Sequence, residues 1–307
     1  MPMSNSLLSK AVGLLKDIHP VLATPIGEFM DGPGGESYVS QAEWILELLQ
    51  RKVGGNSDAF QRAMDAYGQV CFDFIRMQRT FEQRGEYHNR HYETMCQQVY
   101  QDAETMAGYY LDGLLMTFAF WPNHQAIYLF FRNCFLPRLQ KPKKLLEVGV
   151  GHGLFSLSAL EHCPALELRG LDISEFSLQY TRELLQKSSI PDRRYQLQQG
   201  DILDGAPEWM AGVDAAVCGE VLEHVPHPEK VLSAIRRSVK PHAFVFLTTC
   251  ANAEAVDHFY LFHSADHIRS FLYEQAFAIL DELVLAVPGL EGAPRIPINY
   301  ACIGRFS

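Results

Sequence analysis

The segment from residue 143 to residue 161 constrains the fold of this chain more than any other part. It opens with a short apolar run containing Leu145, Leu146 and Val148, which is typical of a strand covered on both faces of a sheet. Three glycines follow at alternate positions, and an apolar helical pattern then continues to residue 161. Because glycine tolerates positive φ and has no side chain, the backbone there can approach a ligand closely. The sequence therefore predicts a strand, a ligand-binding loop and a helix.

A second short apolar run, residues 166–171, ends in Asp172. A carboxylate at the end of the second strand can accept hydrogen bonds from both hydroxyls of a ribose. Together with the glycine loop, Asp172 therefore predicts a ligand that contains a nucleoside.

Two such ligands compete. The dinucleotide fingerprint Gly-x-Gly-x-x-Gly requires a glycine where this chain has Leu154. A pyrophosphate would also gain little from Glu147, whose charge would face the phosphates. S-adenosylmethionine carries no phosphate and has a cationic sulfonium and an ammonium group, so an acidic strand end beside the glycine loop suits it better. The alternative is an ordinary strand, turn and helix with chance glycines, but Asp172 and the later motifs follow in the expected order.

Composition and charge exclude several classes of protein. The chain has 307 residues, of which 48% are hydrophobic and 20% charged, as in a soluble globular protein with one large or two modest domains. The formal net charge is −10 and is negative on both sides of residue 140, so no nucleic-acid partner is expected. Seven scattered cysteines without a Cys-x-x-Cys pair predict reduced thiols in a cytoplasmic protein. No apolar run approaches the roughly 20 residues that span a bilayer, so no membrane association is expected.

The first part of the chain has helical periodicity. We expect the segment 24–37, which is rich in glycine and proline, to form a loop. Lys141 followed by Pro142 marks a junction, so the predicted domains are 1–140, all helical, and 141–307. The expected helices of the first domain are 6–18, 40–52, 58–81, 92–120 and 124–138.

After the junction, strand and helix patterns alternate, which indicates a parallel sheet. The last two strands are joined by a loop alone, so they should pair as an antiparallel hairpin. The predicted class is α/β, with a seven-stranded Rossmann-like sheet, helices on both faces and a helical N-terminal domain. The expected strands are 143–148, 166–171, 194–199, 213–218, 242–248, 277–287 and 297–304, and the expected helices are 153–162, 174–188, 227–239 and 264–275.

Four motifs in this part carry a family resemblance. They lie at residues 146–153, 171–174, 199–202 and 214–225. With them, residues 141–307 resemble a class I S-adenosylmethionine-dependent methyltransferase. The resemblance covers just over half of the chain and says little about the substrate.

The resemblance implies a binding site for S-adenosylmethionine. In it Glu147 lies near the ammonium group, Asp172 holds the ribose hydroxyls and Asp201 accepts from the adenine amino group, as carboxylates can. The glycines let the backbone pass under the methionine, and a turn residue after glycine is the alternative role of Asp201. The full set of predicted cofactor residues is Glu147, Gly149, Gly151, Gly153, Asp172, Ile173, Asp201, Ile202 and Glu220.

A second cluster follows the fourth predicted strand, where open α/β sheets bind ligands. Glu220, Glu223 and His224 lie there, and Asp257 and His258 come later. This pattern resembles the metal-dependent small-RNA 2′-O-methyltransferases and the ubiquinone-biosynthesis O-methyltransferases. The resemblance implies a divalent metal held by Glu220, Glu223, His224 and His258, which would lower the pKa of an acceptor hydroxyl. Without a metal, Glu223 caps a helix, and His224 or His258 is the catalytic base beside Glu220.

Aromatic residues mixed with polar groups mark the N-terminal part, at 72–74, 87–92, 109–110 and 118–121. They predict either a lid that shapes an apolar acceptor pocket or a helix-helix core with a homodimer interface. His88 and His91 are also spaced so that they could bind a metal.

The predicted function is methyl transfer from S-adenosylmethionine to a small-molecule acceptor, with oxygen the expected methylated atom and nitrogen and carbon left open. One alternative is a metal-dependent RNA 2′-O-methyltransferase, which the acidic charge disfavours. The other is a methyltransferase-fold partner protein without activity, which would be expected to have a degraded cofactor loop.

Overall fold

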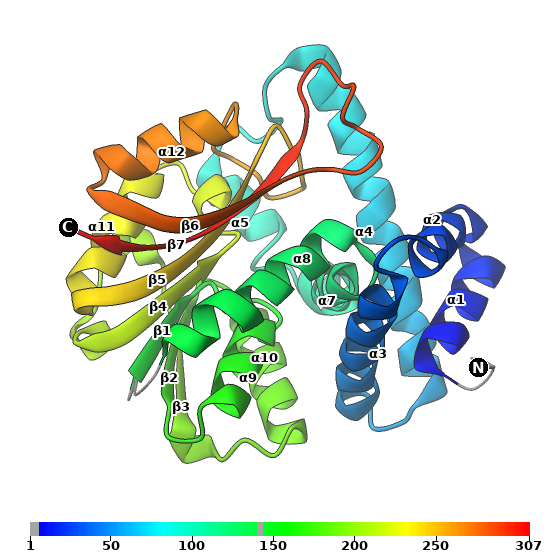
Figure 1. Cartoon of the computed structure of the whole chain (residues 1–307), viewed down its shortest axis with the longest axis horizontal. Helices are drawn as coiled ribbons and strands as arrows, with labels where there is room; N and C mark the ends of the chain where they lie inside the picture. The colour runs from blue at the N-terminus through cyan, green and yellow to red at the C-terminus, as the bar shows by residue number, and fades with distance from the viewer. Residues whose placement is uncertain (1–5, 140–143) are drawn as a thin grey trace.

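The computed structural model describes residues 6–139 and 144–307, so the predicted domain boundary at 140/141 lies outside the described residues. The first of these ranges is helical, as predicted (blue to green in Figure 1). Its elements are α1 (Leu7–Ile18), α2 (Pro20–Asp31), α3 (Gly35–Lys52), α4 (Ser57–Arg84), α5 (Tyr92–Gln98), α6 (Ala103–Thr105), the π-helix η1 (Met106–Tyr110), α7 (Leu111–Phe120), α8 (Pro122–Phe130), the π-helix η2 (Phe131–Phe135) and the 3₁₀-helix η3 (Leu136–Arg138).

The loop predicted for residues 24–37 is wrong. Most of it belongs to α2 and α3, and Pro25 lies inside α2. Pro25 costs one backbone hydrogen bond, but Ala23 and Ile26 on the same helix are 3% and 1% exposed. Burial of this apolar face outweighs the local preference of proline and glycine for a turn.

The single helix predicted for residues 92–120 is also wrong. The chain leaves the helical conformation after α5, and Asp102 starts a new helix by accepting from the backbone N–H of Thr105 at 2.7 Å. The π-helix η1 then brings Tyr109 and Tyr110 to the start of α7. Such π segments recur at functional sites, and both tyrosines do face the cavity described below.

The second described range forms the predicted seven-stranded sheet. Its strand order is β3-β2-β1-β4-β5-β7-β6, in which β7 runs opposite to all the other strands. The predicted antiparallel hairpin is therefore confirmed. The strands are β1 (Lys144–Val148), β2 (Glu167–Asp172), β3 (Tyr195–Gln199), β4 (Val213–Gly219), β5 (Val239–Ala251), β6 (Phe277–Ala286) and β7 (Ile298–Phe306), and the helices are α9 (Leu154–His162), α10 (Glu175–Lys187), α11 (Pro228–Ser238) and α12 (Ala265–Glu274).

Helices cover both faces of the sheet, as predicted (Figure 1). Adjacent residues of one strand point to opposite faces, so Leu145 joins one hydrophobic core and Leu146 the other. The first core includes side chains of α9, α10 and the N-terminal helices, whereas the second includes side chains of α11 and α12. Because β1 to β5 run parallel, their carboxyl ends meet at one edge of the sheet, beside the helical region.

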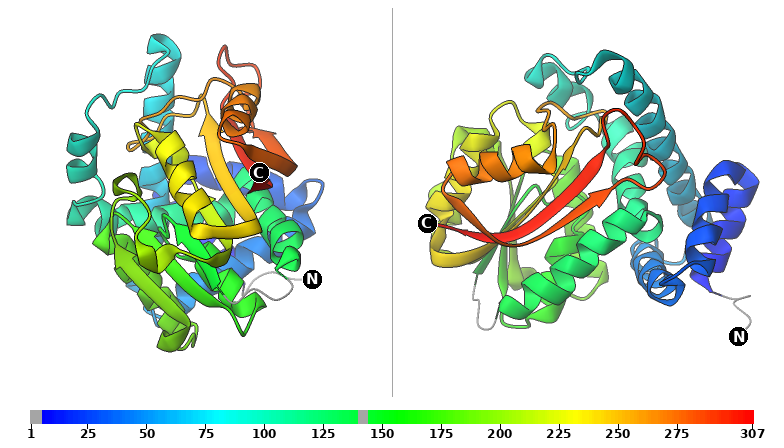
Figure 2. Two further views of the ribbon diagram at one scale, coloured as in Figure 1. Left: turned by 90° about the vertical axis from the view of Figure 1, so that its left-hand side faces the viewer. Right: turned by 45° about the horizontal axis from the view of Figure 1, so that its top comes forward.

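The helical region contacts that edge through α4. In both views of Figure 2, one end of α4 (cyan) lies near the red loop between β6 and β7. Gln78 of α4 donates to the carbonyl of Asn252 at 3.0 Å, and Arg295 donates to the carbonyl of Glu82 at 3.2 Å. No helix in the described residues is long and apolar enough to cross a membrane. All seven cysteines are free thiols.

Candidate active site

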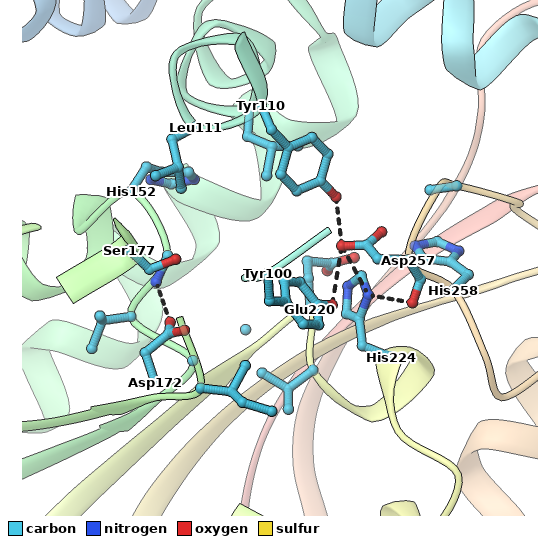
Figure 3. Close-up of a pocket in the computed structure, with 18 of the residues that line it drawn as sticks. Tyr100, Tyr110, Leu111, His152, Asp172, Ser177, Glu220, His224, Asp257 and His258 are labelled. Carbon is cyan, nitrogen blue, oxygen red and sulfur yellow. Dashed lines mark hydrogen bonds and ion pairs between the residues drawn. The ribbon is translucent and has the colours of Figure 1, made fainter. Parts of the chain in front are cut away.

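A cavity of about 260 Å³ lies between the glycine loop and the helical region. Residues of both parts line it, and its walls are mostly apolar. Figure 3 shows His152 and Asp172 on one side of this cavity and Tyr110, Asp257 and His224 on the other. The first side comes from β1 and β2, and the second from the helical region and the loops after β4 and β5.

The glycine loop forms the floor of the cavity. Gly149, Gly151 and Gly153 have φ values of +74°, +51° and +75°, a region that residues with side chains rarely adopt. A Cβ at Gly149 would come within 2.5 Å of Val221, whereas a Cβ at Gly151 would meet no atom of the described residues within 4 Å. The predicted glycines thus have different roles, since the first permits close packing and Gly151 leaves open space for a ligand.

Glu147 lies at the inner end of β1 and is only 2% exposed. One of its carboxyl oxygens accepts a hydrogen bond from the hydroxyl of Ser156. Burial raises the pKa of Glu147 to about 8, and the nearby Asp172 adds to that effect. A cationic group in the cavity would therefore be stabilised by this carboxyl and would displace its proton.

Asp172 ends β2 and has two functions in the fold. Its Oδ2 accepts from the backbone N–H of Gly151 at 3.0 Å, and its Oδ1 accepts from that of Ser174 at 2.9 Å. Burial raises the pKa of Asp172 to about 6, although these backbone donors oppose the shift. Asp172 thus fixes the glycine loop and also presents its carboxylate to the cavity.

The predicted adenine contacts also line the cavity. Ile173, Asp201 and Ile202 follow the carboxyl ends of β2 and β3. Asp201 caps a short helix by accepting from the backbone N–H of Leu203 at 2.8 Å, so the turn role considered for it is real. Since Asp201 also faces the cavity, the turn role does not exclude a ligand contact.

Glu220 holds a strained backbone conformation directly after β4. Its φ is +50°, and its N–H donates to the carbonyl and hydroxyl oxygens of Thr248 at 3.1 and 2.9 Å. Its Oε1 is buried and has no hydrogen-bond donor among the residues that the structure describes. A strained residue with an unpaired buried oxygen at a cavity wall is typical of a functional site.

The four predicted metal ligands do not form one group. Ligand atoms of Glu223, His224 and His258 lie within 4.8 Å of one another, and those of Glu220, Glu223 and Cys250 form a second such group. Glu223 belongs to both, is fully buried, and its Oε1 finds no donor in the described part of the chain. Burial, followed by the charge of Glu220, raises the pKa of Glu223.

Asp257 belongs to the pattern noted in the sequence, where it was given no role, and the structure places it in the site. Its Oδ2 accepts from the hydroxyls of Tyr110 at 2.6 Å and Tyr100 at 3.1 Å (Figure 3). Burial alone would raise the pKa of Asp257, but His224, His258 and the two hydroxyls outweigh it and lower the pKa. Both tyrosines precede Asp257 by well over a hundred residues, so no local motif could have revealed the cluster.

Asp257 also determines which ring nitrogen of His224 carries the proton. The Nδ1 of His224 lies 3.1 Å from the carbonyl oxygen of Asp257 and 3.3 Å from its carboxylate. Since both partners only accept, Nδ1 carries a proton and donates. In the neutral ring, Nε2 of His224 then has a free lone pair.

His258 lies beside His224, with the ring centres 4.9 Å apart. Its Nδ1 donates to the carbonyl of Ala253 at 2.6 Å. Burial lowers the pKa of His258 to about 4, so this ring is neutral at pH 7. The structure therefore brings both candidate bases together, but it aligns only His224 on a carboxylate.

The N-terminal aromatics divide between the two roles considered for them. Phe120 is 1% exposed in the core and Phe72 is 41% exposed to solvent. His88 pairs with Glu254 at 2.8 Å rather than with His91. The aromatics that line the cavity are Phe74, Tyr92, Tyr100, Tyr109, Tyr110, Phe118 and Trp121.

Comparison with known proteins agrees with this architecture. Residues 146–245 match the family model described as a methyltransferase domain. The structure of the mitomycin 7-O-methyltransferase MmcR superposes with a TM-score of 0.51 at 14% identity, covering 87% of this chain and 73% of that one. At that identity, the match supports the fold alone.

Curated relatives match the same part of the chain. A ubiquinone biosynthesis O-methyltransferase from Neisseria meningitidis serogroup A is 28% identical over 131 residues, which is 42% of this chain and 53% of the relative. Another protein of that name from Azoarcus sp. strain BH72 is 36% identical over 107 residues, 35% of this chain and 44% of the relative. The chain thus spans about half the length of the curated relatives it matches.

Proposed function

We propose that this chain, whose residues 146–245 form a methyltransferase domain, transfers a methyl group from S-adenosylmethionine to an oxygen of a small-molecule acceptor. One observation carries the proposal. The open floor at Gly151 is surrounded by Glu147, Asp172 and Asp201 at the carboxyl ends of three neighbouring strands.

The charges of the cavity favour this methyl donor over a dinucleotide. No Lys or Arg is among the described residues that line it, so a pyrophosphate would find no cation there. S-adenosylmethionine supplies an ammonium for Glu147, ribose hydroxyls for Asp172 and an adenine amino group for Asp201. Each carboxylate then accepts from a donor of the ligand.

When bound, S-adenosylmethionine supplies an electrophilic methyl group. The chain then has to place the acceptor atom in line with it and exclude water. Asp172 holds the glycine loop through a hydrogen bond from the backbone N–H of Gly151, so the surface under the ligand is supported from within the protein. Apolar walls on the helical side offer water few hydrogen bonds.

His224 is the proposed base. An acceptor hydroxyl must lose its proton as the new O–C bond forms, and the free Nε2 of His224 can take it. The carboxylate of Asp257, which lies 3.3 Å from Nδ1 of His224, then stabilises the imidazolium. Asp257 is a positioning residue in this scheme, held in turn by Tyr100 and Tyr110.

A divalent metal is the alternative role for the same cluster. Glu223, His224 and His258 would hold it, since Oε1 of Glu223 is buried, has no donor within the described ranges and lies 3.9 Å from Nε2 of His224. Such a metal would supply Lewis acidity that lowers the pKa of the acceptor hydroxyl. His224 would then be a ligand rather than a base.

A small acceptor is favoured over RNA by charge. The formal net charge is −10, and the carboxylates in the cavity would repel a phosphate backbone. The names of the curated relatives support oxygen as the methylated atom.

The test uses S-adenosylmethionine with a deuterated methyl group. The protein is incubated with it and, in parallel, with the small-molecule and RNA fractions of a cell extract, with and without EDTA. We expect a deuterated small molecule and stoichiometric S-adenosylhomocysteine, and loss of turnover in EDTA if the metal is required. Label found only in RNA, or no label in a protein that binds S-adenosylhomocysteine, would contradict the proposal.

A further inference from the structure

We propose that the helical side of the cavity is an acceptor subsite for a planar aromatic molecule that carries no negative charge. The inference rests on the proposed function and adds the chemical class of the acceptor. Two walls of the cavity and the signs of its charges support it.

The first wall is a continuous series of rings. Phe74 of α4 lies 5.5 Å from Trp121, and Trp121 lies 4.9 Å from His124, measured between ring centres. Phe118 of α7 continues the series, 5.0 Å from His124 and 5.2 Å from His152. All five rings line the cavity. Because His152 lies between Gly151 and Gly153, this wall reaches the glycine loop.

The second wall is hydrogen-bonded. Asp73 accepts from the hydroxyl of Tyr109 at 3.2 Å, and the adjacent Tyr110 donates to Asp257. Asp257 contacts His224, so this wall extends from α4 to the proposed base. A flat molecule held against the first wall would therefore have one edge toward the glycine loop and could present a hydroxyl to His224.

The charges of the subsite select against anions. Asp73 and Asp257 are among its carboxylates, and no Lys or Arg lines any described part of the cavity. Arg76 pairs with Asp73 at 2.6 Å, but its side chain is 74% exposed and does not line the cavity. Burial lowers the pKa of His124 to about 3 and that of His152 to about 4, so neither ring offers a positive charge.

The aromatic walls and the absence of Lys and Arg from the described lining together define the class of ligand. Rings of this kind bind planar aromatic molecules through stacked and edge-on contacts. A carboxylate or phosphate would lose its hydration here without a Lys or Arg to pair with, which is costly. An uncharged aromatic molecule has no such cost.

The test uses two molecules of nearly the same shape, 2-naphthamide and 2-naphthoate. Each is titrated by calorimetry into the protein saturated with S-adenosylhomocysteine, whose own binding is measured first. We expect 2-naphthamide to bind, and we expect the affinity for 2-naphthoate to be lower by about tenfold or more. Equal or tighter binding of 2-naphthoate, or no binding of 2-naphthamide, would overturn the subsite. Failure to bind S-adenosylhomocysteine would instead contradict the proposed function.

Two variants locate the site. Trp121→Leu should weaken the binding of 2-naphthamide about tenfold and leave the binding of S-adenosylhomocysteine unchanged. Trp44→Leu is the matched control, because Trp44 stacks on Tyr128 at 5.1 Å and does not line the cavity. Asp73→Asn should reduce the difference in affinity between 2-naphthamide and 2-naphthoate, because it removes a negative charge from the subsite. An unchanged affinity for 2-naphthamide in Trp121→Leu, or an equal loss in Trp44→Leu, would contradict the placement.

Discussion

Glu147 shows at the scale of one residue how burial prepares the cavity for a cation. Burial raises its pKa from 4.5 to about 8 in the folded chain. Between these values the folded chain binds more protons than the unfolded chain, so the contribution of Glu147 to the free energy of unfolding falls as pH rises from about 4.5 to about 8. A ligand that brings an ammonium group would reverse this destabilisation.

The binding of S-adenosylhomocysteine at pH 7 should therefore release a proton from Glu147 to the solvent. Its ammonium group favours ionised Glu147, which is mostly protonated in the free protein. Calorimetry in two buffers of different ionisation enthalpy should give different observed heats, and Glu147→Gln should remove most of the difference. A wild-type binding heat that does not depend on the buffer would contradict this role.

At His224 the prediction concerns turnover of the acceptor identified by labelling. His224→Ala should lower kcat by roughly 10²–10⁴-fold with S-adenosylhomocysteine affinity unchanged. Asp257→Asn should cost less, because the carbonyl of residue 257 still accepts from Nδ1 of His224. Single-turnover rates of the wild-type and variant proteins check this. An undiminished rate in His224→Ala would assign the proton transfer to another group.

Residues in local motifs could be predicted from the sequence, and residues joined only by folding could not. Glu147, Asp172 and Asp201 each lie at the end of a strand, so their spacing from the glycine loop placed them correctly in the cavity. The partners of Asp257 come from a distant helical segment. The sequence carried no periodic signal for Tyr100 and Tyr110 beyond their aromatic character.

At the scale of elements, the sheet was predictable because strands and helices alternate and short apolar runs end at polar residues. The helical region was less so. Glycine and proline near Pro25 indicated a loop, whereas tertiary burial of Ile26 keeps the segment helical. The break after α5 was hidden because the apolar pattern continues through it, and the cap at Asp102 acts only once the chain has turned.

Ligand binding should depend on the glycine loop. Gly151→Val should abolish S-adenosylhomocysteine binding in a folded protein, because its side chain would enter the open space above the loop. Gly289→Val is the control, since Gly289 has a φ of +82°, a Cβ there would meet no described atom within 4 Å, and it does not line the cavity. Both changes add a similar backbone strain of about 1–2 kcal/mol. Normal binding by Gly151→Val in a titration would show that the loop does not carry the ligand.

At the scale of the whole molecule, the helical region and the sheet share a core. Phe131 of the helical region lies 5.1 Å from Phe246 of β5 and 4.8 Å from Phe155 of α9, between ring centres. The predicted junction near Pro142 therefore separates two patterns of secondary structure within one continuous hydrophobic cluster.

This shared core predicts cooperative unfolding. Calorimetry should show one thermal transition, and Phe246→Ala should lower the free energy of unfolding by about 3–5 kcal/mol while shifting that whole transition. Leu280→Ala is a suitable control, because Leu280 is 48% exposed on β6. Two transitions, of which Phe246→Ala displaces only one, would show that the parts fold independently.

The binding of S-adenosylhomocysteine tests the central claim most directly. Calorimetric titration of the purified protein should give one site per chain. Asp172→Ala should weaken that site by about 1.5–3 kcal/mol, through loss of charge-assisted hydrogen bonds to the ribose. No binding to the wild-type protein, or an affinity that Asp172→Ala leaves unchanged, would contradict the account of the cavity as the site of the methyl donor.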